Sequence, residues 1–257
     1  MENKCAKIHV FSDEREISEF LLSLWRETAK AAIARKNLFT VALSGGTTPQ
    51  GFYRRLHELK ERELWDKTHI FMADERLVPY NHMESNFGMM KTLFLDQVGI
   101  RAANTHEVAT GLVPSAKAAA LYEEEIRSFF ALSDKQDIPV FDLVLLGIGE
   151  DGHTASLFPG ATGIAEKKRL VVTLKRDSED FGRISLMLRV INKAENVVFL
   201  VTGMRKAEIL KRVISDNDLS LPASKIAPEG GRLILVLDRD AASLIPNDEI
   251  EKINTSL

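Results

Sequence analysis

Cysteine, net charge and long apolar segments are all scarce in this chain of 257 residues. The one cysteine, Cys5, excludes an internal disulfide and is typical of a protein in a reducing compartment. The 34 basic residues nearly balance the 37 acidic ones, and the net charge of −3 predicts no broad attraction to nucleic acids or anionic membranes. No apolar run approaches the length of a bilayer span, and the first residues, MENKCAKIHV, lack the apolar segment of a secretory signal. We therefore expect a soluble cytoplasmic protein.

Several motifs that mark common enzyme classes are also missing. No H-E-x-x-H and no cysteine pair is present, so we expect no metal site. No G-x-S-x-G elbow supports a serine hydrolase, and the glycine loop at residues 44–49 lacks the Gly-Lys-Ser/Thr of a Walker A loop. Residues 147–152 do spell G-x-G-x-x-G, but the proline and glycine at 159–160 leave too little chain for the helix of a dinucleotide-binding unit. We expect no nicotinamide, flavin or other cofactor.

The apolar residues of the chain follow a regular order. They make up 45% of it, which is enough for a sizeable core. Apolar runs that are typical of buried strands alternate with amphipathic segments that are typical of helices. The runs lie at residues 7–11, 39–43, 69–73, 105–108, 143–146, 170–174, 184–188, 197–201 and 233–237. This order predicts one α/β domain over residues 1–257, with a mostly parallel sheet and helices on both of its faces.

The most informative segment is residues 142–160, DLVLLGIGEDGHTASLFPG. Its apolar start predicts a buried strand that runs into glycines, and His153 follows with Glu150 and Asp151 beside it. Ligands of open α/β sheets bind at the carboxyl ends of strands, and an imidazole takes up and returns protons near neutral pH. His153 is therefore a candidate proton carrier. The alternative is a solvated histidine in a glycine-rich turn.

A second candidate site is the loop between the strand at 39–43 and a helix predicted at 49–61. Pro49 suits the first helical position, and Thr48 is the expected N-cap. Free backbone N–H groups and the positive end of the helix dipole favour an anion here, and we expect a phosphate monoester. The residues concerned are Ser44, Gly45, Gly46, Thr47 and Thr48. The alternative is an ordinary tight turn between a strand and a helix.

Charged residues near the ends of other strands are further candidates. Asp74 and Arg76 follow the strand at 69–73 and suit an acid/base group and a phosphate fork, with a local Asp–Arg pair as the alternative. Arg183 begins a strand, from which it could reach a ligand or solvent. Lys206 falls in the first turn of a predicted helix, where a cation is unfavourable unless an anion binds. A solvated surface lysine is the alternative for Lys206.

Together these segments resemble the 6-phosphogluconolactonases, which form a wider group with the glucosamine-6-phosphate isomerase/deaminases. The matching segments are LSGGTTP at 43–49, ADERLVP at 73–79, SNFGMMKTLFL at 85–95, LLGIGEDGHTASLFPG at 145–160, RISLML at 183–188, VVFLVTGMRKAEIL at 197–210 and PASKI at 222–226. The form DGHTASLFPG after the glycine loop is similar to that of the lactonases rather than the deaminases. Arg189 departs from the pattern, because relatives usually carry proline there, and we expect it to affect loop shape rather than chemistry.

The resemblance implies hydrolysis of 6-phospho-D-glucono-1,5-lactone to 6-phosphogluconate, the second step of the oxidative pentose phosphate pathway. It implies no metal and no organic cofactor. It also implies a Rossmann-like sheet of the type shared with glucosamine-6-phosphate deaminase and ribose-5-phosphate isomerase. The expected partner is a small sugar phosphate, with no nucleic acid and no membrane, and we expect a monomer or a weak homodimer.

On this hypothesis His153 is the general base, oriented by Asp151 or, as second choice, by Asp74. Backbone N–H groups of the loops at 45–46 and 149–152 are candidates to receive the oxyanion. We assign phosphate binding to Ser44, Gly45, Gly46, Thr47, Thr48, Arg76, Arg183 and Lys206. Two alternatives stay open: an isomerase/deaminase of aldose or amino-sugar phosphates, and a sugar-phosphate binding protein that has lost catalysis.

Overall fold

The computed structural model describes residues 6–111, 114–161, 164, 166, 168–176 and 179–255, so Cys5 lies outside the described residues. The strands of this part form two sheets. They are β1 (Ala6–Phe11), β2 (Phe39–Leu43), β3 (Thr68–Met72), β4 (Asp74–Arg76), β5 (Thr105–His106), β6 (Leu143–Leu146), β7 (Val171–Lys175), β8 (Gly182–Leu186), β9 (Asn196–Val201) and β10 (Arg232–Asp238). Each apolar run identified in the sequence overlaps one of them, and β4 was not predicted because it consists of the charged residues DER.

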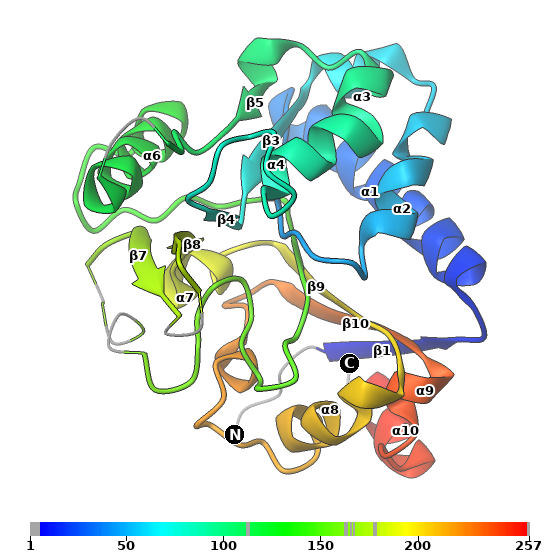
Figure 1. The fold of residues 1–257 in the computed structure, drawn as a ribbon. Coiled ribbons are helices and arrows are strands. Elements are labelled where there is room, and N and C mark those ends of the chain that lie inside the picture. Colours follow the sequence, from blue (N-terminus) through cyan, green and yellow to red (C-terminus); the bar gives the residue numbers. More distant parts are fainter. Residues whose placement is uncertain are drawn as a thin grey trace.

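The larger sheet has seven strands in the order β1-β10-β9-β6-β2-β3-β5, and all of its described pairs are parallel (Figure 1). The smaller sheet, β4-β8-β7, is antiparallel. In this sheet β4, which follows β3 in the chain, pairs with β8, the strand that precedes α7. The predicted α/β class and the mostly parallel sheet are therefore confirmed, with a second sheet that the sequence did not indicate.

The helices are short apart from two. They are α1 (Glu14–Lys36), α2 (Gln50–Arg55), α3 (Arg62–Asp66), α4 (Asn86–Met90), α5 (Asp96–Val98), α6 (Ser115–Phe129), α7 (Leu188–Ile191), α8 (Ala207–Ile214), α9 (Arg239–Ala242) and α10 (Asn247–Thr255). Single turns of 3₁₀-helix cover Leu56–Glu58, Ala102–Asn104, Met204–Lys206 and Ala223–Lys225, and a π-helical turn covers Lys91–Leu95. None of the described helices combines the length and apolar composition that a membrane crossing requires.

Helices pack on both faces of the larger sheet, as predicted (Figure 1). Successive residues of a strand point to opposite faces. On one face His9 of β1 packs on Phe20 of α1, with 4.5 Å between the ring centroids. On the other face Leu235 of β10 lines an apolar cavity together with Ile253 of α10. The sheet is therefore shielded from water on both sides, which parallel sheets require.

The predicted start of the second helix is wrong by one residue. Pro49 occupies the N-cap position, and no side chain caps the helix, so Thr48 is not the cap. The N–H of Gln50 donates to the carbonyl of Thr47 over 3.2 Å, and this turn leads into the helix. The α-helix also ends at Arg55, where a 3₁₀ turn replaces the predicted continuation.

The connections of the chain diverge in the middle of the larger sheet. After β2 the chain passes through α2 to β3 on one side, and after β9 it passes through α8 to β10 on the other. β6 lies between β2 and β9. Open α/β sheets bind ligands where connections diverge in this way, outside the carboxyl ends of the strands. The loops after β2, β6 and β9 are those in which the sequence placed the glycine-rich anion site, His153 and Lys206.

A buried carboxylate joins the amino ends of β2 and β6, away from the cavity edge. Asp142 is fully buried, and its Oδ2 accepts hydrogen bonds from the N–H (2.7 Å) and Oγ1 (2.8 Å) of Thr40. Arg35 and Lys36, at the end of α1, lie 3.1 and 3.0 Å from the same carboxylate. These contacts satisfy the buried charge from two sides and fix α1 to the sheet.

We predict that Asp142→Ala destabilises the protein by about 1–3 kcal/mol, because the N–H of Thr40 is then left buried without an acceptor. The change is measured as the free energy of unfolding in urea. Asp216→Ala is the control, since Asp216 forms only an exposed ion pair with Lys211. Equal stability of the two variants would contradict this role of Asp142.

Candidate active site

The loops after β2, β6 and β9 enclose a cavity of about 280 Å³, and residues of β4 and β8 line it as well. Every predicted site residue except Asp151 lines this cavity. They are Ser44, Gly45, Gly46, Thr47, Thr48, Asp74, Arg76, His153, Arg183 and Lys206. Asp151 lies behind His153 and contacts its ring. The structure thus gathers residues that lie more than a hundred positions apart at the carboxyl edge of the sheet.

His153 is held by a neighbour two positions earlier in the chain. Its Nδ1 lies 2.5 Å from Oδ1 of Asp151, and its backbone N–H donates to the same oxygen over 3.1 Å. This hydrogen bond to the imidazole, together with the charge of Arg176, holds the pKa of Asp151 well below its usual range. The carboxylate therefore accepts, Nδ1 carries the proton, and Nε2 keeps the free lone pair.

The loop around His153 depends on a glycine. A Cβ at Gly149 would lie 2.0 Å from Nδ1 of His153 and 2.6 Å from Oδ1 of Asp151, so a side chain there would displace the pair. The N–H groups of Gly149 and Gly152 donate to the carbonyls of His153 and Gly149. These two N–H groups are therefore used within the loop and are not free to receive the oxyanion, for which the loops at 45–46 and 149–152 were the candidates.

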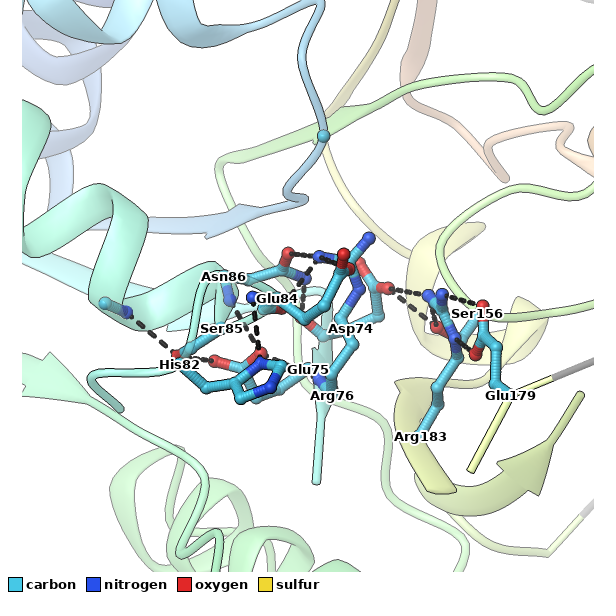
Figure 2. Close-up of polar contacts among 12 residues, drawn as sticks. Asp74, Glu75, Arg76, His82, Glu84, Ser85, Asn86, Ser156, Glu179 and Arg183 are labelled. Carbon is cyan, nitrogen blue, oxygen red and sulfur yellow. Dashed lines mark hydrogen bonds and ion pairs between the residues drawn. The ribbon is translucent and has the colours of Figure 1, made fainter. Parts of the chain in front are cut away.

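The second candidate carboxylate, Asp74, has different partners. Its Oδ2 accepts a hydrogen bond from Oγ of Ser156 over 2.7 Å and lies 4.0 Å from Nη1 of Arg183 (Figure 2). It is buried, and no described contact joins it to His153. The geometry thus pairs the imidazole with Asp151 and leaves Asp74 beside an arginine from β8. A local Asp74–Arg76 pair, the alternative that the sequence left open, is not among the described ion pairs.

The loop after β2 presents unused donors to the cavity. In the described structure the N–H groups of Gly45, Gly46 and Thr47 have no acceptor, and the buried Oγ of Ser44 has no partner. The backbone is held from behind, because the hydroxyl of Tyr53 donates to the carbonyl of Ser44 over 2.7 Å. Such a row of free donors before a helix is a suitable site for an anion.

A second helix start faces the same cavity. Lys206 is the N-cap residue of α8, and none of the described residues forms a hydrogen bond or ion pair with its ammonium group. Partial burial lowers the pKa of Lys206, and the negative charges of Glu150 and Asp151 oppose this shift. Its neighbour Arg205 is largely exposed and lies 3.7 Å from Glu150. An unpaired cation at the positive end of a helix indicates that an anion completes the site.

The two arginines are engaged by the protein itself (Figure 2). Nη1 of Arg76 donates to Oδ1 of Asn86 (2.7 Å) and to the carbonyl of Glu84 (2.9 Å). Arg183 forms a bidentate pair with Glu179, at 2.7 and 2.6 Å, and its guanidinium lies over the ring of Phe158. Both side chains are thus fixed at the cavity wall before any ligand binds.

Sequence reasoning missed four residues of this network: Glu75, Asn86, Ser156 and Glu179. Asn86 lines the cavity, and the others hold residues that do. Asn86 lies in the SNFGMMKTLFL segment, which the sequence singled out only through the family resemblance. Its neighbour Ser85 caps α4, since Oγ of Ser85 accepts from the N–H of Gly88. Among the residues that the structure describes, no three His, Cys, Asp or Glu side chains gather as they would around a metal ion.

Known proteins are similar to this chain in both sequence and fold. A profile of the family described as glucosamine-6-phosphate isomerases/6-phosphogluconolactonase matches residues 12–235. A 6-phosphogluconolactonase of Synechocystis is 39% identical over 212 residues, which cover 82% of this chain and 86% of that protein. The solved 6-phosphogluconolactonase from Trypanosoma cruzi has a TM-score of 0.83 and 30% identity, and covers 95% of this chain and 98% of its own.

A monomeric glucosamine-6-phosphate deaminase of solved structure has a TM-score of 0.74 at 24% identity, covering 93% of this chain and 99% of its own. This likeness confirms the predicted fold type. Together with the match over residues 12–235, these similarities show that the chain belongs to the glucosamine-6-phosphate isomerase/6-phosphogluconolactonase family.

Proposed function

We propose that this chain is a 6-phosphogluconolactonase, a hydrolase that opens 6-phospho-D-glucono-1,5-lactone to 6-phosphogluconate. Relatives that bear this name match it over most of its length. The observation that carries the proposal is the arrangement of the cavity. An imidazole with a free Nε2 lies on the wall that also holds an unpaired lysine and the free N–H groups of a helix start.

In the proposed mechanism His153 activates a water molecule and does not itself attack the lactone carbonyl. Nε2 takes a proton from a water molecule, and the hydroxide adds to the lactone carbonyl to form a tetrahedral intermediate. The imidazolium, stabilised by the ionised Asp151, then gives its proton to the ring oxygen as the carbon–oxygen bond breaks. The proton taken from water thus leaves with the new hydroxyl, and the histidine returns to its starting state.

The phosphate of the substrate lies at the other end of the cavity in this proposal. The N–H groups of Gly45, Gly46 and Thr47, with the hydroxyls of Ser44 and Thr48, surround one side of it. Positive charge comes from Arg76 on β4, Arg183 on β8 and Lys206 at the start of α8. Binding there aims the carbonyl carbon at the water held by His153, so positioning supplies part of the rate enhancement.

We predict that His153→Ala lowers kcat for lactone hydrolysis by about 10²–10⁴-fold, the usual effect of losing a general base. The assay generates the lactone in situ and compares its loss with the spontaneous background. His57→Ala is the control, because His57 is exposed and contacts only the carbonyl of Arg54 among the described residues. A kcat near that of the wild type in His153→Ala would remove His153 from the mechanism. Tight binding of the phosphosugar by a wild-type protein without turnover would favour a binding protein instead.

Asp151→Asn should lower kcat by more than about tenfold. An amide removes the charge that stabilises the imidazolium, and it also permits the tautomer of His153 that carries its proton on Nε2. Asp74→Asn leaves the His153–Asp151 pair intact and should lower kcat less. Steady-state kinetics of the two variants decide which carboxylate serves His153. A larger loss of kcat in Asp74→Asn would assign that role to Asp74.

Lys206→Ala should raise KM for the lactone about tenfold or more with a smaller change in kcat, since Lys206 binds the phosphate alike in the ground and transition states. The matched control is Lys211→Ala on the same helix, where the lysine pairs with Asp216 in solvent. If the two variants had the same KM, Lys206 would be a surface lysine without a part in binding.

A further inference from the structure

Glu75 is a buried acidic residue beside the cavity to which the mechanism assigns no role. It lies between Asp74 and Arg76 on β4, where side chains alternate between the two sides of the strand. Asp74 and Arg76 line the cavity, whereas Glu75 does not line it and is fully buried. Its carboxylate faces the first turn of α4 (Figure 2).

Both oxygens of this carboxylate accept hydrogen bonds from backbone N–H groups, which cannot rotate as side-chain donors can. Oε1 accepts from the N–H groups of Arg76 (2.7 Å) and Asn86 (2.8 Å). Oε2 accepts from the N–H of Phe87 (2.7 Å), and Oγ of Ser85 lies 3.4 Å away. The carboxylate therefore bridges β4 and the N-terminus of α4, whose dipole favours a negative charge at this point.

The residue that this bridge fixes most directly is Asn86. Its Oδ1 accepts from Nη1 of Arg76 (2.7 Å), and its Nδ2 donates to the carbonyl of Asp74 (2.9 Å). Asn86 also packs so closely on Gly45 that a Cβ there would lie 1.7 Å from Oδ1 of Asn86. Movement of Asn86 would therefore shift both the guanidinium of Arg76 and the loop that begins at Gly45.

We propose that Glu75 is a positioning residue that holds Arg76, Asn86 and the Gly45 loop in the arrangement that binds the phosphate of the substrate. The proposal rests on the proposed function for the identity of the substrate. It assigns Glu75 to the phosphate end of the cavity and not to the His153–Asp151 pair, with which it has no described contact. Loss of the carboxylate then weakens ligand binding more than it slows the chemical step.

A carboxamide cannot replace this carboxylate. In either orientation Glu75→Gln places an NH₂ group against backbone N–H donors, either those of Arg76 and Asn86 or that of Phe87. Burial raises the pKa of Glu75 to about 7, while hydrogen bonds from the N–H groups of Phe87, Asn86 and Arg76 oppose the shift and the charge of Asp74 adds to it. Binding is therefore measured at pH 8, where the carboxyl group is ionised.

The experiment compares wild type, Glu75→Gln and the control Glu123→Gln by calorimetry with 6-phosphogluconate and with inorganic phosphate, and by steady-state kinetics with the lactone. Glu123 is also a buried carboxylate that accepts from backbone N–H groups, those of Leu170 (3.1 Å) and Val171 (3.3 Å), but it does not line the cavity. A general loss of packing or stability would affect both variants alike.

We expect Glu75→Gln to raise the Kd of both ligands and the KM of the lactone about tenfold, comparable with the loss of one hydrogen bond to a charged group, and to change kcat much less. Glu123→Gln should leave Kd and KM as in the wild type. Unchanged Kd values in Glu75→Gln, or a loss confined to kcat, would overturn the proposal.

Asn86→Ala provides a second test in case Glu75→Gln does not fold, because it leaves the backbone bonds of Glu75 in place. It should raise the same Kd values, and an unchanged Kd for inorganic phosphate would also overturn the proposal. If wild type failed to accelerate loss of the lactone, the proposed function would fall, while the inorganic-phosphate titrations would still decide the role of Glu75.

Discussion

The parallel pairing of β9, β6 and β2 is the constraint on which the rest of the structure depends. Its register places Leu43 beside Leu145 and Leu146 beside Phe199, so the three strands end at nearly the same level. The connections leave β2 and β9 in opposite directions along the sheet, which leaves room at the carboxyl end of β6 between them. The glycine loop after β6 fills part of that space and carries the imidazole to its edge.

The sequence was sufficient for the features that arise from local patterns. Continuous apolar runs located the strands of the larger sheet, and the glycine loop located His153 at the end of β6. The features that it did not reveal depend on long-range contacts. The three charged residues of the DER segment are typical of an exposed turn. In the structure this segment pairs with β8 as strand β4, and its middle residue, Glu75, points toward α4. The pair of Arg183 with Glu179 is an exception, because these two residues are only four positions apart in the chain.

Arg183, Arg76 and Lys206 differ in the protein groups that they contact in the cavity. Arg183 has the carboxylate of Glu179 at hydrogen-bonding distance. Arg76 donates to the amide oxygen of Asn86 and the carbonyl of Glu84, and the exposed carboxylate of Glu84 lies farther away, at 3.8 Å. Lys206 has neither kind of partner within the described structure. We therefore expect an anionic ligand to gain most of its binding free energy from Lys206 and the free N–H groups. Arg76 and Arg183 then define the shape of the cavity wall and contribute a positive potential. This division suits an enzyme that must release a charged product after each turnover.

The two ends of the cavity also differ in how much of the chain must be folded to make them. Asp151 and His153 are separated by one residue and contact each other within one loop, with Arg176 as a further partner of Asp151. The opposite end is assembled from the loops after β2 and β9 and from β4, β8 and the start of α4. Local opening of β4 would displace Arg76 and its partner Asn86, whereas the contact between His153 and Asp151 does not involve β4. In the proposed function, neighbouring residues of one loop thus supply the general base, whereas residues from distant parts of the chain bind the phosphate of the substrate.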